Sequence, residues 1–322
     1  MKKILVIFGT DSFEHNISCE SVKSVLKNID NCKFNIYVAG IDRENKWFLY
    51  EDNYDLIDKN WSKRNIKNID NVISFCKSFD LVIPIIHGKN GEDGKIQGFF
   101  ELFNIKYIGC NQLTSTIGYD KYLSKLYCEK LDIPQLPYVV LNNINEYKNL
   151  SFEFPVIIKP SKGGSSIGIN VANTKKELKE SLKVAFKYDN KVVVEKYIKA
   201  RELECAILEG KKLIISDIGE ILKEKKFYDF ESKYIDKTKT EIANIPNDIK
   251  IKIKELSKKI FIGMNCKDLS RIDFLYDEEN NKIYFNEINT MPGFTDISMY
   301  PILLNKKNIS FKEILTTIIN NH

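Results

Sequence analysis

Residues 269–293 carry charged side chains at a spacing that could hold a metal ion. They read LSRIDFLYDEENNKIYFNEINTMPG, and no other stretch of the chain is as informative about chemistry. Two runs rich in apolar residues, 269–276 and 282–288, flank a polar segment at 277–281. Apolar runs separated by a short polar segment predict an antiparallel β-hairpin.

Four polar side chains fall on one side of this predicted hairpin. Because side chains alternate along a strand, Arg271 and Asp273 share one face of the first strand. Glu287 and Asn289 share one face of the second, so pairing can gather oxygen ligands beside a guanidinium. Such ligands suit Mg²⁺, which usually keeps waters and bridges nucleotide phosphates. A solvated hairpin face is the alternative, but E-x-N followed by T-M-P-G-F-T, beside R-x-D, favours the metal site.

A glycine-rich segment at residues 159–168, KPSKGGSSIG, could wrap phosphate groups through its backbone N–H groups. Lys159 ends the preceding predicted strand and can place a point charge on those phosphates. The segment is not a Walker loop, because Ile169 and Asn170 stand where Lys and Ser or Thr are required. Glycine also serves ordinary turns, so a flexible hairpin loop is the alternative interpretation.

The predicted strand at residues 192–198 ends where it could meet an adenine ring. Backbone groups of residues 196–198 would bind the edge of the base, and Glu202 could take the ribose hydroxyls. A plain central strand has the same apolar pattern. The strand alone does not choose between these two interpretations.

The composition is typical of a globular enzyme. The 322 residues suffice for two or three domains, and 43% apolar and 29% charged residues are ordinary values. The net charge of +5 is modest, and no basic block indicates a nucleic-acid partner. The seven cysteines include no C-x-x-C pair, which argues against a zinc site and a disulfide framework. No apolar run approaches about 20 residues, and the short one at the start predicts a buried strand rather than a signal peptide. We therefore expect a cytoplasmic protein with no membrane contact.

Strand and helix patterns alternate at the start of the chain, which predicts an open α/β sheet. The expected strands cover residues 4–8, 34–41 and 81–86, and a helix is expected across 17–26. Ligand loops in such sheets follow the carboxyl ends of strands, which selects residues 9–15 and 87–94. The turn-rich residues 133–137 lead into a second unit, and a third begins near Leu213.

Together these motifs resemble those of the D-alanine–D-alanine ligase family, in the ATP-grasp superfamily. Eight pieces follow the family's order between Ile4 and Pro301: FGTDSFEHNIS, HGKNGEDGKIQGFFEL, YDKYLSK, FPVIIKPSKGGSSIGI, VVVEKYIKARELE, FYDFESKY, SRIDF and FNEINTMPGFTDISMYP. One match could arise by chance, but eight collinear matches are highly specific. The resemblance implies a three-domain ATP-grasp fold. An N-terminal open α/β sheet (1–118) would precede two α+β domains (119–212 and 213–322) that clamp ATP.

The resemblance also implies which residues bind ATP and metal. It implies phosphate contacts by Lys121, Lys159 and Lys233, adenine contacts by Lys196 and Ile198 with Glu195 beside them, a ribose contact by Glu202, and a place in the nucleotide site for Phe227. It implies Mg²⁺ or Mn²⁺, expected as a pair of ions, held by Asp273, Glu287 and Asn289.

The substrate and catalytic roles that the resemblance implies involve both ends of the chain. Glu14 would anchor the ammonium of the first D-alanine with His87 nearby, Ser298 would hold the carboxylate of the second, and Tyr228 and Met299 would line the substrate site. Arg271 and the backbone of Gly293 would form the oxyanion site, and Ser165 and Tyr234 would hydrogen-bond Glu14. Thr10 replaces a glycine common in the family's first loop but leaves Glu14 in register.

The implied reaction is phosphoryl transfer followed by acyl transfer. The first D-alanine's carboxylate attacks the γ-phosphate of ATP, and the second D-alanine's amine attacks the resulting acyl phosphate. Acyl phosphates hydrolyse, so residues 163–168 and 227–239 are expected to close over the site as lids. The family context implies a homodimer that makes a peptidoglycan precursor for the cell wall.

Two alternative functions remain at this point. A D-alanine–D-serine ligase of the vancomycin-resistance type is favoured by HGKNGEDG and IDRENKWFLY. Against it, Tyr228 and Tyr234 are intact, and Gly219 and Met299 stand where that branch tends to carry an acid and Arg. A nucleotide-binding protein without chemistry is disfavoured because the predicted metal ligands are all present.

Overall fold

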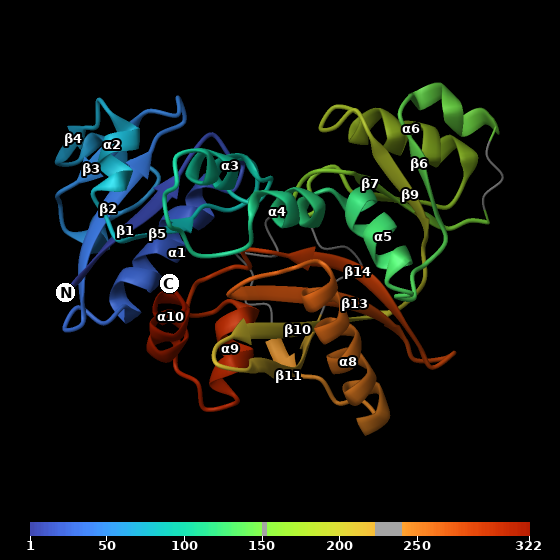
Figure 1. Ribbon diagram of the computed structural model, residues 1–322. Coiled ribbons are helices and arrows are strands. Elements are labelled where there is room, and N and C mark those ends of the chain that lie inside the picture. Colours follow the sequence, from blue (N-terminus) through green and yellow to red (C-terminus); the bar gives the residue numbers. More distant parts are fainter. Residues whose placement is uncertain (150–152, 223–239) are drawn as a thin grey trace.

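Three β-sheets, each with its own helices, make up the molecule (Figure 1). The computed structural model describes residues 1–149, 153–222 and 240–322. The expected lid at 227–239 lies outside the described residues, as do the predicted site residues Phe227, Tyr228, Lys233 and Tyr234. The described parts confirm the predicted α/β fold with three sheet-based units.

The N-terminal sheet has the strand order β4-β3-β2-β1-β5. Its strands are β1 (Lys2–Gly9), β2 (Phe34–Ile41), β3 (Trp47–Tyr50), β4 (Ile66–Asn68) and β5 (Leu81–Ile85). Its helices are α1 (His15–Asn28), α2 (Val72–Lys77), α3 (Lys95–Leu102) and α4 (Gln112–Tyr119), with short 3₁₀ turns at Tyr54–Leu56 and Trp61–Lys63. Strand β1 pairs in parallel with β2 and β5, and it is buried from Ile4 to Gly9. This is the continuous apolar pattern that a central parallel strand requires, so the predicted open α/β sheet is confirmed.

The central sheet is antiparallel, with the order β6-β9-β7-β8. Its strands are β6 (Tyr138–Leu141), β7 (Val156–Pro160), β8 (Asn170–Ala172) and β9 (Val192–Lys196), and its helices are α5 (Lys121–Lys130) and α6 (Lys175–Ala185), with a 3₁₀ turn at Ile144–Asn149. The side chain of Asp120 caps α5 by accepting from the backbone of Tyr122 and Leu123. That cap fixes the start of α5, whose first residue is the predicted phosphate ligand Lys121.

The C-terminal sheet has the order β12-β11-β10-β13-β14. Its strands are β10 (Arg201–Glu209), β11 (Leu213–Ile221), β12 (Thr240–Ile242), β13 (Leu269–Asp277) and β14 (Lys282–Asn289), and its helices are α8 (Asn247–Gly263), α9 (Met299–Asn305) and α10 (Phe311–Asn320). Strand β10 pairs with both β11 and β13. The third sheet therefore begins at Arg201, before the domain limit expected at residue 213, and the domain limits remain a prediction.

The chain returns to its beginning at the C-terminus. Figure 1 shows α10 beside the N-terminal sheet, and α1 and α10 are in contact. Val22 and Val25 of α1 share one hydrophobic core with Ile314 and Ile318 of α10. The first and last helices thus fix how the N-terminal and C-terminal sheets sit against each other. Among the described residues, no helix is long and apolar enough to cross a membrane.

Candidate active site

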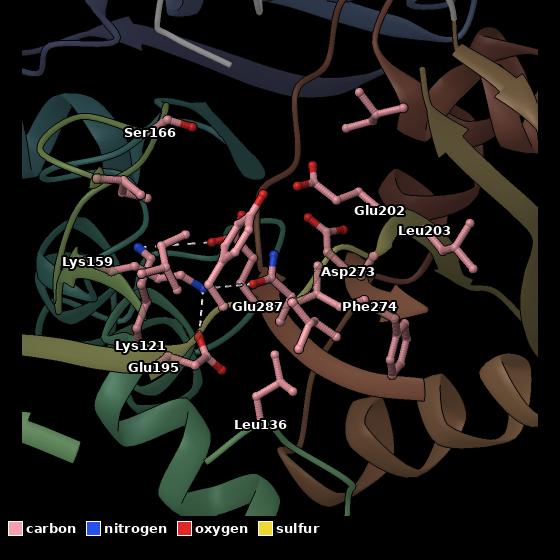
Figure 2. A pocket seen from close by; sticks show the side chains of 18 of the residues that line it. Lys121, Leu136, Lys159, Ser166, Glu195, Glu202, Leu203, Asp273, Phe274 and Glu287 are labelled. Atoms are coloured by element: carbon pink, nitrogen blue, oxygen red, sulfur yellow. Dashed lines mark hydrogen bonds and ion pairs between the residues drawn. The ribbon is translucent and has the colours of Figure 1, made fainter. Parts of the chain in front are cut away.

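A cavity lies between the central and C-terminal sheets (Figure 2). The predicted site residues that line it are Lys121, Lys159, Ser165, Glu195, Lys196, Ile198, Glu202, Arg271, Asp273 and Glu287. They come from helix α5, from strands of both sheets and from the glycine-rich loop at 163–168. The structure therefore gathers in one place residues that are up to 166 positions apart, from Lys121 to Glu287.

The predicted hairpin is confirmed by strands β13 and β14. Their antiparallel register places Asp273 opposite Glu287 and Arg271 opposite Asn289. The register shifts immediately after Asp273, a β-bulge that breaks the regular pairing at the metal-ligand position. The amide nitrogen Nδ2 of Asn289 donates to Oδ2 of Asp273 at 3.0 Å. The four polar groups come together as predicted, but the bulge is what achieves it: the register of Phe274 with Phe285, continued regularly, would place Asp273 opposite Asn286 instead of Glu287.

Arg271 is held by two carboxylates. Its guanidinium donates to both oxygens of Asp273, at 2.8 Å from Nε and 2.7 Å from Nη2, and its Nε lies 3.0 Å from Oε2 of Glu204. Burial lowers the pKa of Arg271, but Asp273 and Glu204 outweigh burial and hold it well above its usual value. Arg271 is therefore a fixed positive charge at the wall of the cavity.

The polar side chains of the hairpin fit a hard cation. Asp273 and Glu287 offer carboxylate oxygens and Asn289 offers an amide oxygen, which is the donor set that Mg²⁺ and Mn²⁺ prefer. Within the described ranges, no group of three His, Cys, Asp or Glu side chains is placed to hold a metal. Two carboxylates and one amide leave coordination positions that substrate oxygens and waters would fill.

Two lysines face this acidic patch from the opposite wall. Nζ of Lys121 donates to the carbonyl of Gly163 at 2.6 Å and lies 4.0 Å from Oε2 of Glu287. Nζ of Lys159 donates to Oε2 of Glu195 at 2.8 Å and to Oδ1 of Asn286 at 3.1 Å (Figure 2). Lysines thus line one side of the cavity and carboxylates the other. This arrangement suits a nucleotide, because lysines can contact its phosphates while carboxylates hold the metal ion that accompanies them.

The predicted adenine hinge follows β9 directly. The backbone N–H of Lys196 donates to the carbonyl of Pro137 at 2.9 Å, and that of Tyr197 donates to the carbonyl of Pro155 at 3.0 Å. Ile198 and Glu202 continue the same wall of the cavity. These hydrogen bonds fix the backbone of residues 196–198, which the sequence predicts to bind the adenine. Contact with a nucleotide stays a prediction.

The glycine-rich loop touches the loop after β1. Oγ of Ser165 donates to Oε1 of Glu14 at 2.5 Å, which joins two residues 151 positions apart. Ser165 and Ser166 both adopt left-handed backbone angles, with φ of 52° and 59°. This conformation is uncommon for serine, and it turns the Ser165 side chain to Glu14. The predicted pairing of Ser165 with Glu14 is present.

A small buried network surrounds Glu14. His87 contacts Oγ of Ser21 through Nε2 at 2.9 Å, and Glu92 accepts from the backbone of Gly88 at 2.8 Å. Burial lowers the pKa of His87 to about 4. Burial, with the nearby negative charge of Glu14, raises the pKa of Glu92 to about 8. Both groups are therefore mainly uncharged at neutral pH.

The remaining predicted residues follow strand β14. A Cβ atom placed on Gly293 would lie 3.0 Å from Oγ of Ser298, so these two predicted substrate contacts are neighbours. The hydroxyls of Ser298 and Thr295 lie 2.7 Å apart. Met299 is only 5% exposed and packs beside Gly219 in the hydrophobic core. The structure thus brings Gly293 and Ser298 together but places Met299 among core side chains.

Two protein-family models match the chain, one at each end. The family model for the N-terminal region of D-ala D-ala ligase matches residues 3–110, and the model for the C-terminal region matches residues 127–320. The chain belongs to the D-alanine–D-alanine ligase family. It is 40% identical to a D-alanine–D-alanine ligase of Acetivibrio thermocellus, over 99% of this chain and 95% of the relative. It is 39% identical to one of Clostridium novyi, over 99% of this chain and 97% of the relative.

Solved structures of the family share the fold. The VanG D-Ala:D-Ser ligase of Enterococcus faecalis superposes with a TM-score of 0.88 at 33% identity, covering 99% of this chain and 98% of that one. A D-alanine–D-alanine ligase of Bacillus anthracis, solved in complex with ATP, gives a TM-score of 0.78 at 28% identity, covering 99% and 97%. The ATP-grasp fold predicted from the motifs is confirmed.

Three ionisable residues in and around the site were not singled out from the sequence. Lys125 lies one helical turn after Lys121, and the i, i+4 spacing on α5 could have indicated it. Glu204 lies two positions after Glu202 on β10, so alternation places both on one face. Glu92 lies in the HGKNGEDG loop beside His87. Each had a local signal, but only the fold shows what these side chains contact.

The hairpin geometry predicts the effect of removing one carboxylate. We expect Glu287→Gln to lower the rate of ADP formation by about a hundredfold or more, because it removes a negative oxygen ligand from the metal site. Glu287 is partly exposed rather than core, so the thermal unfolding midpoint should stay close to that of the unmodified protein. Glu279→Gln, in the exposed hairpin turn, is the matched control. Normal Mg²⁺-dependent turnover in folded Glu287→Gln would remove Glu287 from the metal site.

The raised pKa of Glu92 predicts a pH dependence of stability. In the unfolded chain Glu92 ionises near its ordinary pKa of about 4.3, whereas in the folded protein it keeps its proton until about pH 8. Stability is therefore lost as the pH rises through this interval, by up to about 1.4 kcal/mol per pH unit. We expect Glu92→Gln to be more stable than the unmodified protein at about pH 8.5, with the difference shrinking toward pH 5. Urea unfolding at both pH values measures it, and a pH-independent difference would contradict it.

Proposed function

We propose that this chain joins two D-alanines to D-alanyl-D-alanine at the expense of ATP, through an acyl phosphate. The observation that carries the proposal is one cavity in which two lysines face two carboxylates and a partly buried arginine. Membership of the family and the D-alanine–D-alanine ligases at 39–40% identity support the same reaction.

ATP would occupy the cavity between the two sheets. The adenine would meet the backbone after β9, and Glu202 would take the ribose. Lys121 and Lys159 would contact the phosphates, since their ammonium groups reach the cavity from α5 and β7. Lys233 and Phe227, which are outside the described residues, complete the proposed nucleotide contacts. A solved relative that holds ATP supports this assignment.

Mg²⁺ or Mn²⁺, as a pair of ions, would be held by Asp273, Glu287 and Asn289. When bound, such ions offset the charge of the transferring phosphoryl group. The lysines of the opposite wall add positive charge from the other side of the phosphate chain. The residues of this site therefore favour attack on the γ-phosphate by a negatively charged carboxylate.

The two D-alanines would bind on the side of the N-terminal sheet. Glu14 would pair with the ammonium of the first, with His87 nearby, and Ser298 would hold the carboxylate of the second. The amine of the second then attacks the carbonyl carbon of the acyl phosphate, inorganic phosphate leaves and the nitrogen loses a proton, and Arg271 and the N–H of Gly293 would stabilise the oxyanion. Losing one such donor typically costs about 10²–10³-fold in rate. Tyr228, Tyr234 and Met299 complete the proposed substrate site.

The product is a peptidoglycan precursor for the cell wall. We place the reaction in the cytoplasm and propose a homodimer, as the family implies. Size-exclusion chromatography with light scattering tests the second statement directly.

The glycine-rich loop should respond to ligands. Residues 163–168 combine glycines at positive φ with two serines in left-handed conformation, and this loop carries the Ser165 contact to Glu14. We expect amide hydrogen exchange across residues 161–168 to slow when ADP and a phosphinate-type analogue are both added, because a closed loop excludes water. Exchange in β1, which is already buried, is the internal control. Unchanged exchange in the loop would mean that it is not a lid.

D-alanine–D-serine ligation is the second candidate, since the VanG ligase shares the fold at a TM-score of 0.88. Gly219 and Met299 offer no strong hydrogen-bonding side chain for a serine hydroxyl. They also lie in contact, and a Cβ on Gly219 would come within 2.6 Å of the Met299 sulfur. The curated D-alanine ligases at 39–40% identity, above the 33% of VanG, favour D-alanine.

The choice between D-alanine and D-serine has a direct test. We expect D-alanine to be preferred as second substrate by kcat/KM, with D-serine used slowly and D-lactate hardly at all. A pocket without a polar partner rejects an added hydroxyl only by about 10²-fold, so some mixed dipeptide should form. Competition at equal D-alanine and D-serine, with products separated by mass, measures the preference. If the main product is D-alanyl-D-serine, the chain is instead a D-alanine–D-serine ligase of the vancomycin-resistance type.

Met299→Arg is expected to narrow the gap between D-alanine and D-serine. Because Met299 is buried against Gly219, the same change also places a charge among core side chains. The product ratio is therefore to be read together with the thermal unfolding midpoint of the variant. An unchanged ratio in a folded Met299→Arg protein would remove residue 299 from the determinants of specificity.

A further inference from the structure

A completely buried carboxylate lies beneath the proposed nucleotide site. Glu195, on β9, is 0% exposed, and each of its oxygens contacts a different lysine. Oε1 accepts from Lys125 at 2.5 Å, and Oε2 accepts from Lys159 at 2.8 Å. The cluster therefore contains two positive charges and one negative charge. Only one of the two lysines can be balanced by Glu195.

The two lysines differ in what else they can reach. Lys159 lines the cavity. Lys125 is 1% exposed, and it is not one of the described residues that line this cavity. Its Nζ lies 5.0 Å from the centre of the Tyr138 ring, and its backbone carbonyl accepts from Gln135 at 2.9 Å. Lys125 is thus fixed between Glu195 and an aromatic face, and it can influence a ligand only through Glu195.

The charge balance gives Lys125 a specific task. Two opposite charges in contact within a poorly solvated region attract each other strongly. If Glu195 had only Lys159 as partner, that pair would be neutral, and a phosphate would compete with Glu195 for the same ammonium. With Lys125 present, Glu195 is neutralised from behind, and the three groups together present one positive charge to the cavity.

The pKa directions of Lys125, Lys159 and Glu195 agree with a charged Lys159 beside an ionised Glu195. Burial lowers the pKa of Lys125, partly opposed by Glu195. Burial acts in the same direction on Lys159, but Glu195, together with the carboxylates of Glu287 and Glu202, outweighs it and raises the pKa of Lys159. Burial raises the pKa of Glu195, but the two lysines together hold it below its usual value. Glu195 is therefore ionised, and Lys159 keeps its charge at neutral pH.

We propose that Lys125 is a positioning residue for nucleotide binding: it neutralises the buried Glu195 and so leaves the charge of Lys159 available to the phosphates. This inference rests on the proposed function, because it takes Lys159 as a phosphate ligand. It concerns affinity for the phosphate part of the nucleotide and not for its base. That distinction separates an electrostatic role from a merely structural one.

The test compares ADP with adenosine. In Lys125→Met, Glu195 keeps Lys159 as its partner and withdraws that charge from the ligand. We expect the Kd for ADP, measured by titration calorimetry, to rise by about tenfold to a hundredfold, the loss of one charged contact. The Kd for adenosine should change by less than about threefold. Lys130→Met, at the exposed end of the same helix, is the matched control.

A double variant tests the charge argument itself. Lys125→Met with Glu195→Gln removes one positive and one negative charge, so Lys159 is again available. The ratio of the ADP and adenosine affinities should return toward that of the unmodified protein. Lys125→Gln, which keeps a donor to Glu195 without its charge, should match Lys125→Met and replaces it if the methionine variant does not fold.

The outcomes separate this inference from the proposed function. Failure of the unmodified protein to bind ADP would overturn both. If it binds ADP, then a parallel loss of ADP and adenosine in Lys125→Met, or no loss of either, would overturn the role of Lys125 alone. A double variant no better than the single one would do the same. Recovery of the ratio in the double variant supports the proposal.

Discussion

Charge burial is the constraint on which this site depends. A charged side chain taken out of water must be paired within the protein. Here Lys159 is bonded to Glu195, and Arg271 is bonded to Asp273 and Glu204. A ligand entering the cavity therefore does not meet bare charges. To bind, the ligand must replace ion pairs that these side chains already make within the protein. Its affinity therefore depends on how strong those ion pairs are.

The charged groups that a ligand would contact come from three different sheets, so the relative position of the sheets determines the site. The lysine wall comes from the central sheet and α5, the acidic wall comes from the β13–β14 hairpin, and Glu14 comes from the loop after β1. The core shared by α1 and α10 fastens the N-terminal sheet to the C-terminal one. Contact between Ser165 and Glu14 then joins the central loop to the N-terminal sheet. Packing far from the cavity thus sets the distances within it.

Much of this arrangement could be predicted from local patterns. Alternation and a polar turn were enough to predict the β13–β14 hairpin, but not the bulge after Asp273 that places Asp273 opposite Glu287. Contacts between residues far apart in the sequence could not be predicted in this way. Nothing near Lys125 in the sequence indicates Glu195, 70 positions later, as its partner. Likewise, Met299 at the start of helix α9 packs against Gly219 of strand β11, 80 positions earlier.

Arg271 shows how one ion pair links the proposed metal site to the proposed oxyanion site. Asp273 directs both oxygens to the Arg271 guanidinium, so the carboxylate that is proposed to hold a cation is also the one that orients the arginine. Glu204, 3.0 Å from Nε, lies on the neighbouring strand β10, directly opposite Asp273, and remains a partner for Arg271. In the proposed site, Asp273 would hold a cation that offsets phosphate charge, while its hydrogen bonds and Glu204 keep the Arg271 guanidinium at the wall of the cavity, where the oxyanion would form.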